Sequence, residues 1–297
     1  MKLARYRSAR DGPVWVGLVT DDLITPVGDG AGRAGQDRLL AAAVGRPAVP
    51  DAVGEPEPLD RVQLLTPVPE PPSIRDFYAF EAHVATARRS RGLEMESDWY
   101  ELPVFYFTNP AAVLGPGDEV APPADTAELD YELEVAAVIG VECADLAPGE
   151  WLGIVAGFTV MNDWSARDLQ RREMAMGLGP AKGKDFATSL GPVLVTPEEL
   201  LDPNGVPRAT MVARVNGEEW SRGELGDLHF GWGDLLAHAS RATRLRPGDV
   251  IGSGTVGTGC ILELGLVHDR DRYPWLTSGD EVALEVEGIG VLAGRIA

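Results

Sequence analysis

The 297-residue chain is poor in cysteine, in histidine and in basic residues. Its two cysteines, Cys143 and Cys260, offer neither a disulfide framework nor the spacing of a zinc site, so we expect a reducing, cytoplasmic location. Only 26 Lys and Arg face 46 Asp and Glu, and the formal net charge of -20 argues against nucleic acid and anionic membranes as partners. No apolar run is long enough to span a bilayer, and the charged start "MKLARYRSARDG" lacks the apolar core of a signal peptide.

Short apolar and alternating runs, typical of β-strands, outnumber the helical patterns in this chain. Strands are predicted at 2–7, 13–20, 129–140, 153–163, 191–196, 210–220, 249–254, 260–267 and 280–297. Helices are predicted at 38–45, 80–92, 165–176 and 230–243. A proline-rich, acidic stretch around residues 60–72 marks a boundary. We therefore expect a small N-terminal β domain, residues 1–68, and a mainly β (α+β) domain with peripheral helices, residues 69–297.

Three carboxylates alternate with apolar residues in the strand predicted at 129–140. Asp130, Glu132 and Glu134 share one face, because side chains at i and i+2 of a strand point the same way. A solvated strand face would give the same pattern. The strand continues as "AAVIG", however, so it enters the core, where neighbouring carboxylates are costly unless a cation holds them. An all-oxygen ligand set suits Mg²⁺, Mn²⁺ or Ca²⁺ better than zinc, and we expect Mg²⁺.

The junction "VMNDWSAR" places Asp163 between an apolar strand and a predicted helix. The motif S-A-R-D fits a capping box with Ser165 as the N-cap and Asp168 three residues later. Asp163 is then not needed as a cap. We therefore consider it a candidate fourth oxygen ligand.

Three further stretches contain residues that could carry chemistry. In "RDFYAFEAH", Asp76 and His83 lie seven residues apart and would share a face if the segment were helical throughout. The glycine-rich loop that holds Lys184 is not a phosphate-binding loop, because Asp185 follows the lysine where Ser or Thr is required. "GSGTVG" at 252–257 matches G-x-G-x-x-G, but a strand is expected after it, so we do not interpret it as a dinucleotide site.

Five separated motifs, "RDFYAFEAH", "DYELEVAAVIG", "MNDWSARDLQ", "KGKDFATSLGP" and "GSGTVGTGCILEL", resemble the fumarylacetoacetate hydrolase family in order and spacing. The resemblance covers residues 70–297 and implies a mixed β-sandwich roll, one divalent cation and a homodimer. It implies four metal ligands: Asp76, Glu132, Glu134 and Asp163. Asp130 has no ligand role in that pattern.

The same resemblance implies roles for eight further residues. His83, with Glu263 as its partner, matches the pair that activates water. The positions of the oxyanion site match Lys184, Arg167 and Gln170. The residues that contact substrate match Tyr78, Tyr106 and Thr255.

The implied function is a metal-dependent hydrolase of the EC 3.7.1 type that cleaves the C–C bond of a 1,3-dioxo acid such as fumarylacetoacetate or an acylpyruvate. A metal-dependent decarboxylase, hydratase or isomerase of 2-oxo acids on the same scaffold is the alternative. The histidine in the first motif favours hydrolysis, because many of those relatives lack it. A binding protein that has kept only the metal site is a third hypothesis, which the full set of ligands, base and lysine disfavours.

Overall fold

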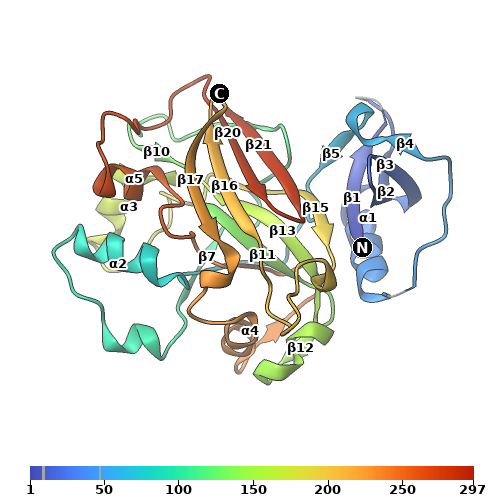
Figure 1. The fold of residues 1–297 in the computed structure, drawn as a ribbon, viewed down its shortest axis with the longest axis horizontal. Helices are drawn as coiled ribbons and strands as arrows, with labels where there is room; N and C mark the ends of the chain where they lie inside the picture. Colours follow the sequence, from blue (N-terminus) through green and yellow to red (C-terminus); the bar gives the residue numbers. More distant parts are fainter. Residues whose placement is uncertain (9–10, 47) are drawn as a thin grey trace.

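The computed structural model describes residues 1–8, 11–46 and 48–297. Among these residues, strands far outnumber helices, as the sequence predicted (Figure 1). The α-helices are α1 (Gly32–Val44), α2 (Glu81–Arg89), α3 (Arg167–Met174), α4 (Trp232–Ser240) and α5 (Ile261–Val267). Single 3₁₀ turns cover Leu59–Arg61, Ser97–Tyr100, Pro148–Gly153, Pro197–Glu199 and Leu225–Asp227. The fold is therefore mainly β with peripheral helices.

The largest sheet has twelve strands in the described part of the chain, ten of them in the order β4-β3-β2-β1-β15-β13-β11-β19-β6-β7. They are β1 (Lys2–Arg7), β2 (Val14–Thr20), β3 (Leu23–Asp29), β4 (Glu57–Pro58), β6 (Ile74–Phe77), β7 (Phe105–Thr108), β11 (Leu133–Ile139), β13 (Val155–Asp163), β15 (Thr188–Val195) and β19 (Val250–Gly252). Beside this path, β5 (Gln63–Leu65) pairs with β1 and β8 (Val113–Leu114) pairs with β15.

A second sheet of five strands runs in the order β17-β16-β20-β21-β9 and lies across β11 and β13 (Figure 1). Its strands are β9 (Glu119–Val120), β16 (Thr210–Val215), β17 (Glu218–Glu224), β20 (Glu281–Val286) and β21 (Gly290–Ile296). Two small ladders complete the set: β10 (Leu129–Asp130) with β14 (Ser165–Ala166), and β12 (Cys143–Ala144) with β18 (Arg244–Leu245).

Both faces of the central strands are buried, which explains why β11 and β13 read as nearly continuous apolar runs. Along β11, Leu133, Val135 and Ala137 belong to the core against the second sheet. The alternate residues Ala136 and Val138 belong to a second core that includes apolar residues of α1. This alternation decides the face on which the acidic residues of the strand lie.

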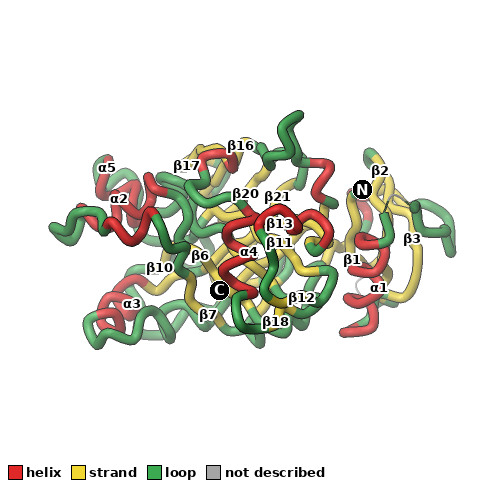
Figure 2. Tube along the Cα trace, turned by 90° about the horizontal axis from the view of Figure 1, so that it is seen from below, coloured by secondary structure: helices red, strands yellow, loops and turns green. Residues whose placement is uncertain are grey.

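The N-terminal strands are joined to the main sheet. Strand β1 pairs antiparallel with β15, through Lys2 with Val195 and Leu3 with Leu194. Figures 1 and 2 both place β1–β3 and α1 at one end of the molecule, and α2, α3 and α5 at the other. A division at residue 68 stays a proposal, because one sheet runs through both parts.

Three local predictions were wrong. Residues 261–267 form helix α5, whereas a strand was expected, because a short apolar run fits a buried helix as well as a buried strand. The segment from Asp76 to His83 is a strand, β6, followed by helix α2, so its two ends do not share a helix face. Ser165 is not an N-cap: it lies in β14, its hydroxyl donates to Asp163 O, and α3 begins at Arg167.

A strand was expected after "GSGTVG", and that was the argument against a dinucleotide site; the structure has a helix there instead. The structure provides a different argument against such a site. The first backbone N–H groups of α5, those of Ile261 and Leu262, donate to the carboxylate of Asp130. A pyrophosphate would need those same groups.

Candidate active site and metal centre

Three of the four predicted ligands meet at one buried point. One carboxylate oxygen from each of Asp76, Glu132 and Glu134 lies within 4.8 Å of the other two. Lys184 Nζ contacts both Glu132 and Asp163, which places the fourth carboxylate beside them. All four residues are at most 5% exposed. The four carboxylates thus form one cluster, which we call the carboxylate site.

The two-residue period of the strands produces this cluster. On β11, Glu134 is in phase with Ala136; on β13, Asp163 is in phase with Met161; on β6, Asp76 is in phase with Ile74. These three apolar residues belong to the same core, against α1, so the carboxylates lie on that same face. Glu132 precedes β11 in the same phase, and Asn162 Oδ1 accepts a hydrogen bond from its backbone N–H at 3.0 Å.

Several carboxylate oxygens of the site lack a partner. Asp76 Oδ1, Glu134 Oε2 and Asp163 Oδ1 are buried and accept no hydrogen bond from any described residue. Burial, and then the charge of a neighbouring carboxylate, raises the pKa of Asp76 and of Glu134 well above the ordinary value. Unpaired buried oxygens of this kind are costly unless a cation binds them. The donor set therefore fits a hard divalent cation, as the sequence predicted.

Lys184 supplies one positive charge to the carboxylate site. Its Nζ lies 2.5 Å from Glu132 Oε2 and 2.5 Å from Asp163 Oδ2, and Tyr106 OH also donates to Asp163 Oδ2. Burial alone would raise the pKa of Glu132, but the charges of Lys184 and then Arg167 lower it overall. Burial lowers the pKa of Lys184, but Asp163 and Glu132 raise it on balance, so this side chain stays a cation.

Gly252 is a site residue that the sequence did not single out. It pairs with Asp76 in the register of β19 and β6. A Cβ at this position would lie 2.4 Å from Asp76 Oδ1, one of the unpaired oxygens. Glycine at this position therefore leaves room for the carboxylate of Asp76, a predicted ligand. The sequence signal was a glycine inside a strand pattern.

The predicted catalytic pair is formed by two helices. His83 lies in the first turn of α2 and Glu263 in the first turn of α5, and the two helices pack against each other. His83 Nδ1 lies 2.7 Å from Glu263 Oε2, and both side chains are buried. After Lys184 and Arg167, His83 is among the groups that lower the pKa of Glu132, so the pair lies within electrostatic reach of the carboxylate site.

Each of the three nitrogens of the Arg167 guanidinium donates a hydrogen bond. Its Nε donates to Asp130, one terminal nitrogen donates to Glu132, and the other donates to Gln170 Oε1. Because a guanidinium only donates, Gln170 turns its oxygen toward Arg167 and its NH₂ group away from it. Arg167 thus orients Gln170, and no described residue accepts a hydrogen bond from the NH₂ group of Gln170.

Two of the three predicted substrate residues contact carboxylates that are predicted metal ligands. Thr255 Oγ1 lies 3.3 Å from Glu134 Oε1, and Tyr106 donates to Asp163. Tyr78 lies edge-on to the ring of His83, with 5.3 Å between the ring centroids, and burial raises the pKa of Tyr78 to about 12. Tyr78 thus stays a neutral phenol beside the catalytic pair.

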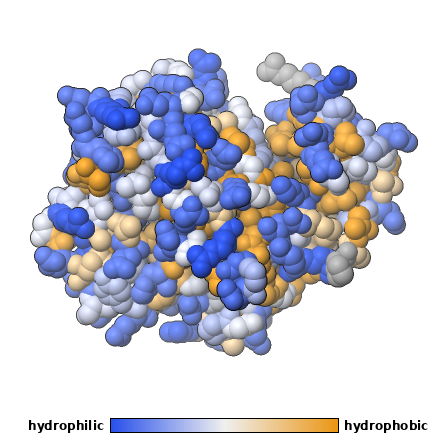
Figure 3. Space-filling model, in the orientation of Figure 1, coloured by the Kyte–Doolittle hydropathy of each residue, from blue (hydrophilic) through white to orange (hydrophobic). Residues whose placement is uncertain are grey.

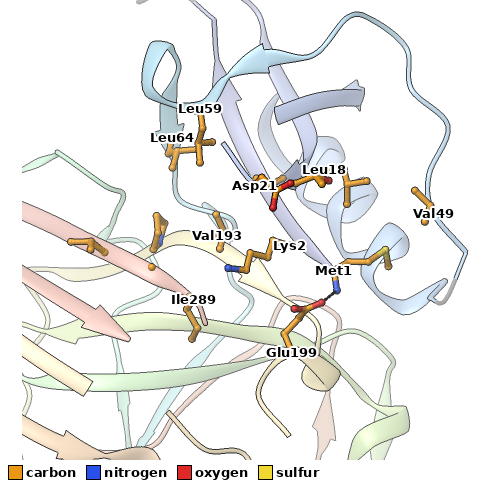
Figure 4. Close-up of a pocket in the computed structure, with 15 residues that line it drawn as sticks. Met1, Lys2, Leu18, Asp21, Val49, Leu59, Leu64, Val193, Glu199 and Ile289 are labelled. Atoms are coloured by element: carbon orange, nitrogen blue, oxygen red, sulfur yellow. Dashed lines mark hydrogen bonds and ion pairs between the residues drawn. The ribbon is translucent and has the colours of Figure 1, made fainter. Parts of the chain in front are cut away.

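A groove of about 670 Å³ lies elsewhere, between the N-terminal strands and the second sheet (Figure 4). Leu18, Leu64, Val193 and Ile289 line it, and none of its lining residues belongs to the site predicted from the sequence. Figure 3 shows apolar surface in the same region, where the N-terminal strands meet the rest of the molecule. The chemistry described above does not involve this groove.

The model of the family "Fumarylacetoacetate (FAA) hydrolase C-terminal" matches residues 73–297. The chain therefore belongs to the fumarylacetoacetate hydrolase family, as the five motifs indicated. Among solved structures, it is similar to a fumarylacetoacetate hydrolase from Exiguobacterium antarcticum, with a TM-score of 0.76 and 29% identity over 100% of this chain and 99% of that one. It is also similar to a 5-carboxymethyl-2-hydroxymuconate delta-isomerase from Mycobacterium smegmatis, with a TM-score of 0.72 and 28% identity over the same shares of the two chains.

Curated relatives carry a different activity in their names. The human mitochondrial oxaloacetate tautomerase FAHD2A is 35% identical over 195 residues, which are 65% of this chain and 59% of that protein. The oxaloacetate tautomerase YisK of Bacillus subtilis is 31% identical over 241 residues, 80% of this chain and 74% of that protein. The match thus spans about three fifths of the human relative's length.

No helix among the described residues is both long and apolar enough to cross a membrane. The human relative is named as a mitochondrial protein. A cytoplasmic location for this chain stays a prediction.

Proposed function

We propose that this protein is a metal-dependent hydrolase that cleaves the C–C bond of a 1,3-dioxo acid of the acylpyruvate or fumarylacetoacetate type. The observation that carries the proposal is the buried contact of 2.7 Å between His83 Nδ1 and Glu263 Oε2. A carboxylate that accepts the Nδ1 proton leaves the Nε2 lone pair free to take a proton. Such a pair beside a metal site is the arrangement that activates a water molecule.

Asp76, Glu132, Glu134 and Asp163 would hold the divalent cation, with Mg²⁺ favoured and Mn²⁺ or Ca²⁺ as alternatives. When bound, the cation acts as a Lewis acid that polarises the oxygens of a chelating dioxo substrate. The unpaired oxygens of three of these residues support this assignment. Lys184 offsets part of their negative charge and holds Glu132 and Asp163 in place.

The protein's own groups account for the proton transfers. His83 Nε2 takes a proton from water, Glu263 stabilises the imidazolium, and the hydroxide adds to the acyl carbonyl carbon. The NH₂ group of Gln170 donates to the alkoxide that forms there. The C–C bond then breaks toward the oxo-acid half as its enolate, and His83 returns the proton to the enolate carbon. One carboxylic acid and one oxo acid result, a 2-oxo acid from an acylpyruvate and a 3-oxo acid from fumarylacetoacetate, so one water is consumed.

A second candidate is a tautomerase, decarboxylase or isomerase of 2-oxo acids. The oxaloacetate tautomerases among the relatives support it, because they share the family and much of the sequence. On that hypothesis the same carboxylate site binds a 2-oxo acid, and a base moves a proton at carbon without adding water. The two candidates therefore differ in whether an oxygen from water enters the product.

The test is a panel of acylpyruvates, fumarylacetoacetate and oxaloacetate, assayed with Mg²⁺ and with Mn²⁺ in ¹⁸O-labelled water. Hydrolysis predicts ¹⁸O in the released carboxylic acid and stoichiometric formation of the oxo acid, a 2-oxo acid from an acylpyruvate and a 3-oxo acid from fumarylacetoacetate. Interconversion of the keto and enol forms of oxaloacetate, or loss of CO₂ from it, without hydrolysis of any dioxo acid would replace the first candidate with the second.

We also propose a homodimer, the assembly that the family resemblance implies. Exposed strand edges favour pairing with a second copy. Light scattering at micromolar concentration tests this, and a monomeric mass would contradict it.

A further inference from the structure

One buried acidic residue beside the site has no role in the mechanism above. Asp130 lies in β10, two residues before Glu132, and its side chain is fully buried. Three N–H donors converge on it: Ile261 N at 2.7 Å from Oδ1, and Leu262 N at 3.0 Å and Arg167 Nε at 2.8 Å from Oδ2. Both of its carboxylate oxygens have donors, so neither is among the unpaired oxygens of the carboxylate site.

The first two donors belong to α5. The first N–H groups of a helix have no partners within the helix, and the N-cap residue, Cys260, supplies no side-chain acceptor. Asp130, which lies in β10 and 131 residues before Ile261 in the chain, supplies the acceptor instead. Glu263 follows Leu262 directly. The position of its carboxylate against His83 therefore depends on a first turn that Asp130 holds.

The third donor connects Asp130 to the opposite side of the site. Arg167 bridges Asp130 and Glu132 and donates to Gln170 Oε1. A guanidinium has a rigid planar fork, so fixing its Nε fixes the directions of its terminal nitrogens as well. Asp130 thereby sets how Gln170 presents its NH₂ group.

We propose that Asp130 is a positioning residue that aligns Glu263 of the catalytic pair and the Arg167–Gln170 unit with the carboxylate site, without binding metal or substrate. The proposal rests on the proposed function in one respect: it takes the His83–Glu263 pair as the base. An ionised carboxylate is required because three donors point at it. An asparagine has one acceptor oxygen, and its NH₂ group would face another donor.

The first test substitutes Asp130→Asn and compares it with Glu128→Gln, two residues away. Glu128 makes an ion pair with Arg171 outside the core, so it is a matched control. We expect Asp130→Asn to lower kcat for an acylpyruvate by roughly 10²-fold, the loss that a displacement of about 1 Å can cause. KM and the calorimetric affinity for Mg²⁺ should change less than about threefold, because the four ligands are intact. A fall in metal affinity as large as the fall in kcat would overturn the proposal.

A double-mutant cycle separates positioning from a general loss of structure. The part of the Asp130 effect that passes through Glu263 should vanish in a Glu263→Gln background, so Asp130→Asn should lower kcat less there than in the wild type. Independent losses that multiply would refute action through Glu263. If Asp130→Asn lowers the folded fraction measured by circular dichroism, Asp130→Ser, which leaves space for a water acceptor, replaces it in the same cycle.

Imidazole NMR tests the proposal without any activity. The chain has four histidines, and among the described residues only His83 contacts a carboxylate. A strongly deshielded Nδ1 proton of His83 should be present in the wild type and in Glu128→Gln, and lost or shifted in Asp130→Asn. An unchanged signal in Asp130→Asn would refute the positioning of the pair. A wild-type enzyme that hydrolyses no dioxo acid would instead refute the proposed function and leave this comparison valid.

Discussion

The substitution His83→Asn tests the proposed base with little damage to the fold. The side-chain NH₂ group that the substitution introduces would stand near the place of His83 Nδ1, which now lies 2.7 Å from Glu263 Oε2. A donor to the buried carboxylate is thus kept, whereas the nitrogen that would accept the proton of water, Nε2, is removed. The substitution separates the chemical role of the ring from its structural one.

The expected magnitude follows from the role. A positioned general base contributes about 10²–10⁴ in rate, which corresponds to about 3–5 kcal/mol of the activation barrier. His83→Asn should lower kcat for a 1,3-dioxo acid by that factor. KM and Mg²⁺ affinity should stay close to the wild type, because His83 is not among the carboxylate ligands. Hydrolysis at a near wild-type rate by the purified variant would refute the mechanism.

His83→Ala is the companion measurement. It leaves Glu263, which is 0% exposed, without its imidazole partner and with only a weak contact of 3.7 Å from Cys260 Sγ. Breaking a buried pair from one side typically costs about 3–5 kcal/mol. The free energy of unfolding in urea should therefore fall clearly for His83→Ala and much less for His83→Asn. Equal stabilities for the two variants would show that the contact has no structural role.

Three further predictions concern the metal site and the oxyanion donor. Millimolar Mg²⁺ should raise the melting temperature of the chelator-treated protein. Glu134→Gln removes one charged oxygen from the cluster, so it should weaken that effect. Equal shifts in both proteins would contradict the ligand assignment. Gly252→Ala should weaken Mg²⁺ binding in calorimetry by displacing Asp76 Oδ1, from which the added Cβ would lie 2.4 Å; unchanged affinity would mean that the strand adjusts without moving the ligand. Gln170→Leu should lower kcat by about 10²-fold with metal affinity unchanged, the usual effect of losing one oxyanion donor.

The carboxylate site could be predicted from the sequence because strand geometry is local. Glu132 and Glu134 lie two residues apart, and a period of two places them on one face whatever the rest of the chain does. The same reasoning led from the apolar strand to Asp163 at its end. The motifs of the family then added Asp76, which local patterns alone had placed on a helix. The structure brings Asp76, Glu132 and Glu134 together and confirms a mainly β fold.

Contacts between distant segments could not be predicted. Residues 261–267 form a helix whose first N–H groups bond to Asp130, and nothing within the seven-residue run encodes that partner. At Ser165, a local pattern was present but did not determine the structure. The S-A-R-D pattern satisfies the capping rule, but pairing of Ser165 with Asp130 draws the serine into a ladder and delays the helix to Arg167. Tertiary pairing overrode a local preference at Ser165, whereas in 261–267 the local pattern left helix and strand equally open.

The predicted ligands lie on the sheet and the predicted base lies on a helix, and this separation bears on which reaction the protein performs. The carboxylates come from the central sheet and the adjoining chain, where both faces are buried and the register is fixed. The proposed base comes from α2 and its partner from α5, two short helices at the end of the sandwich (Figures 1 and 2). Changes in those helices can alter the proton chemistry while the cation site persists. Relatives named as tautomerases, isomerases and a hydrolase can therefore share this sheet, and assays that vary His83 and Glu263 are more informative about the reaction than assays that vary the metal ligands.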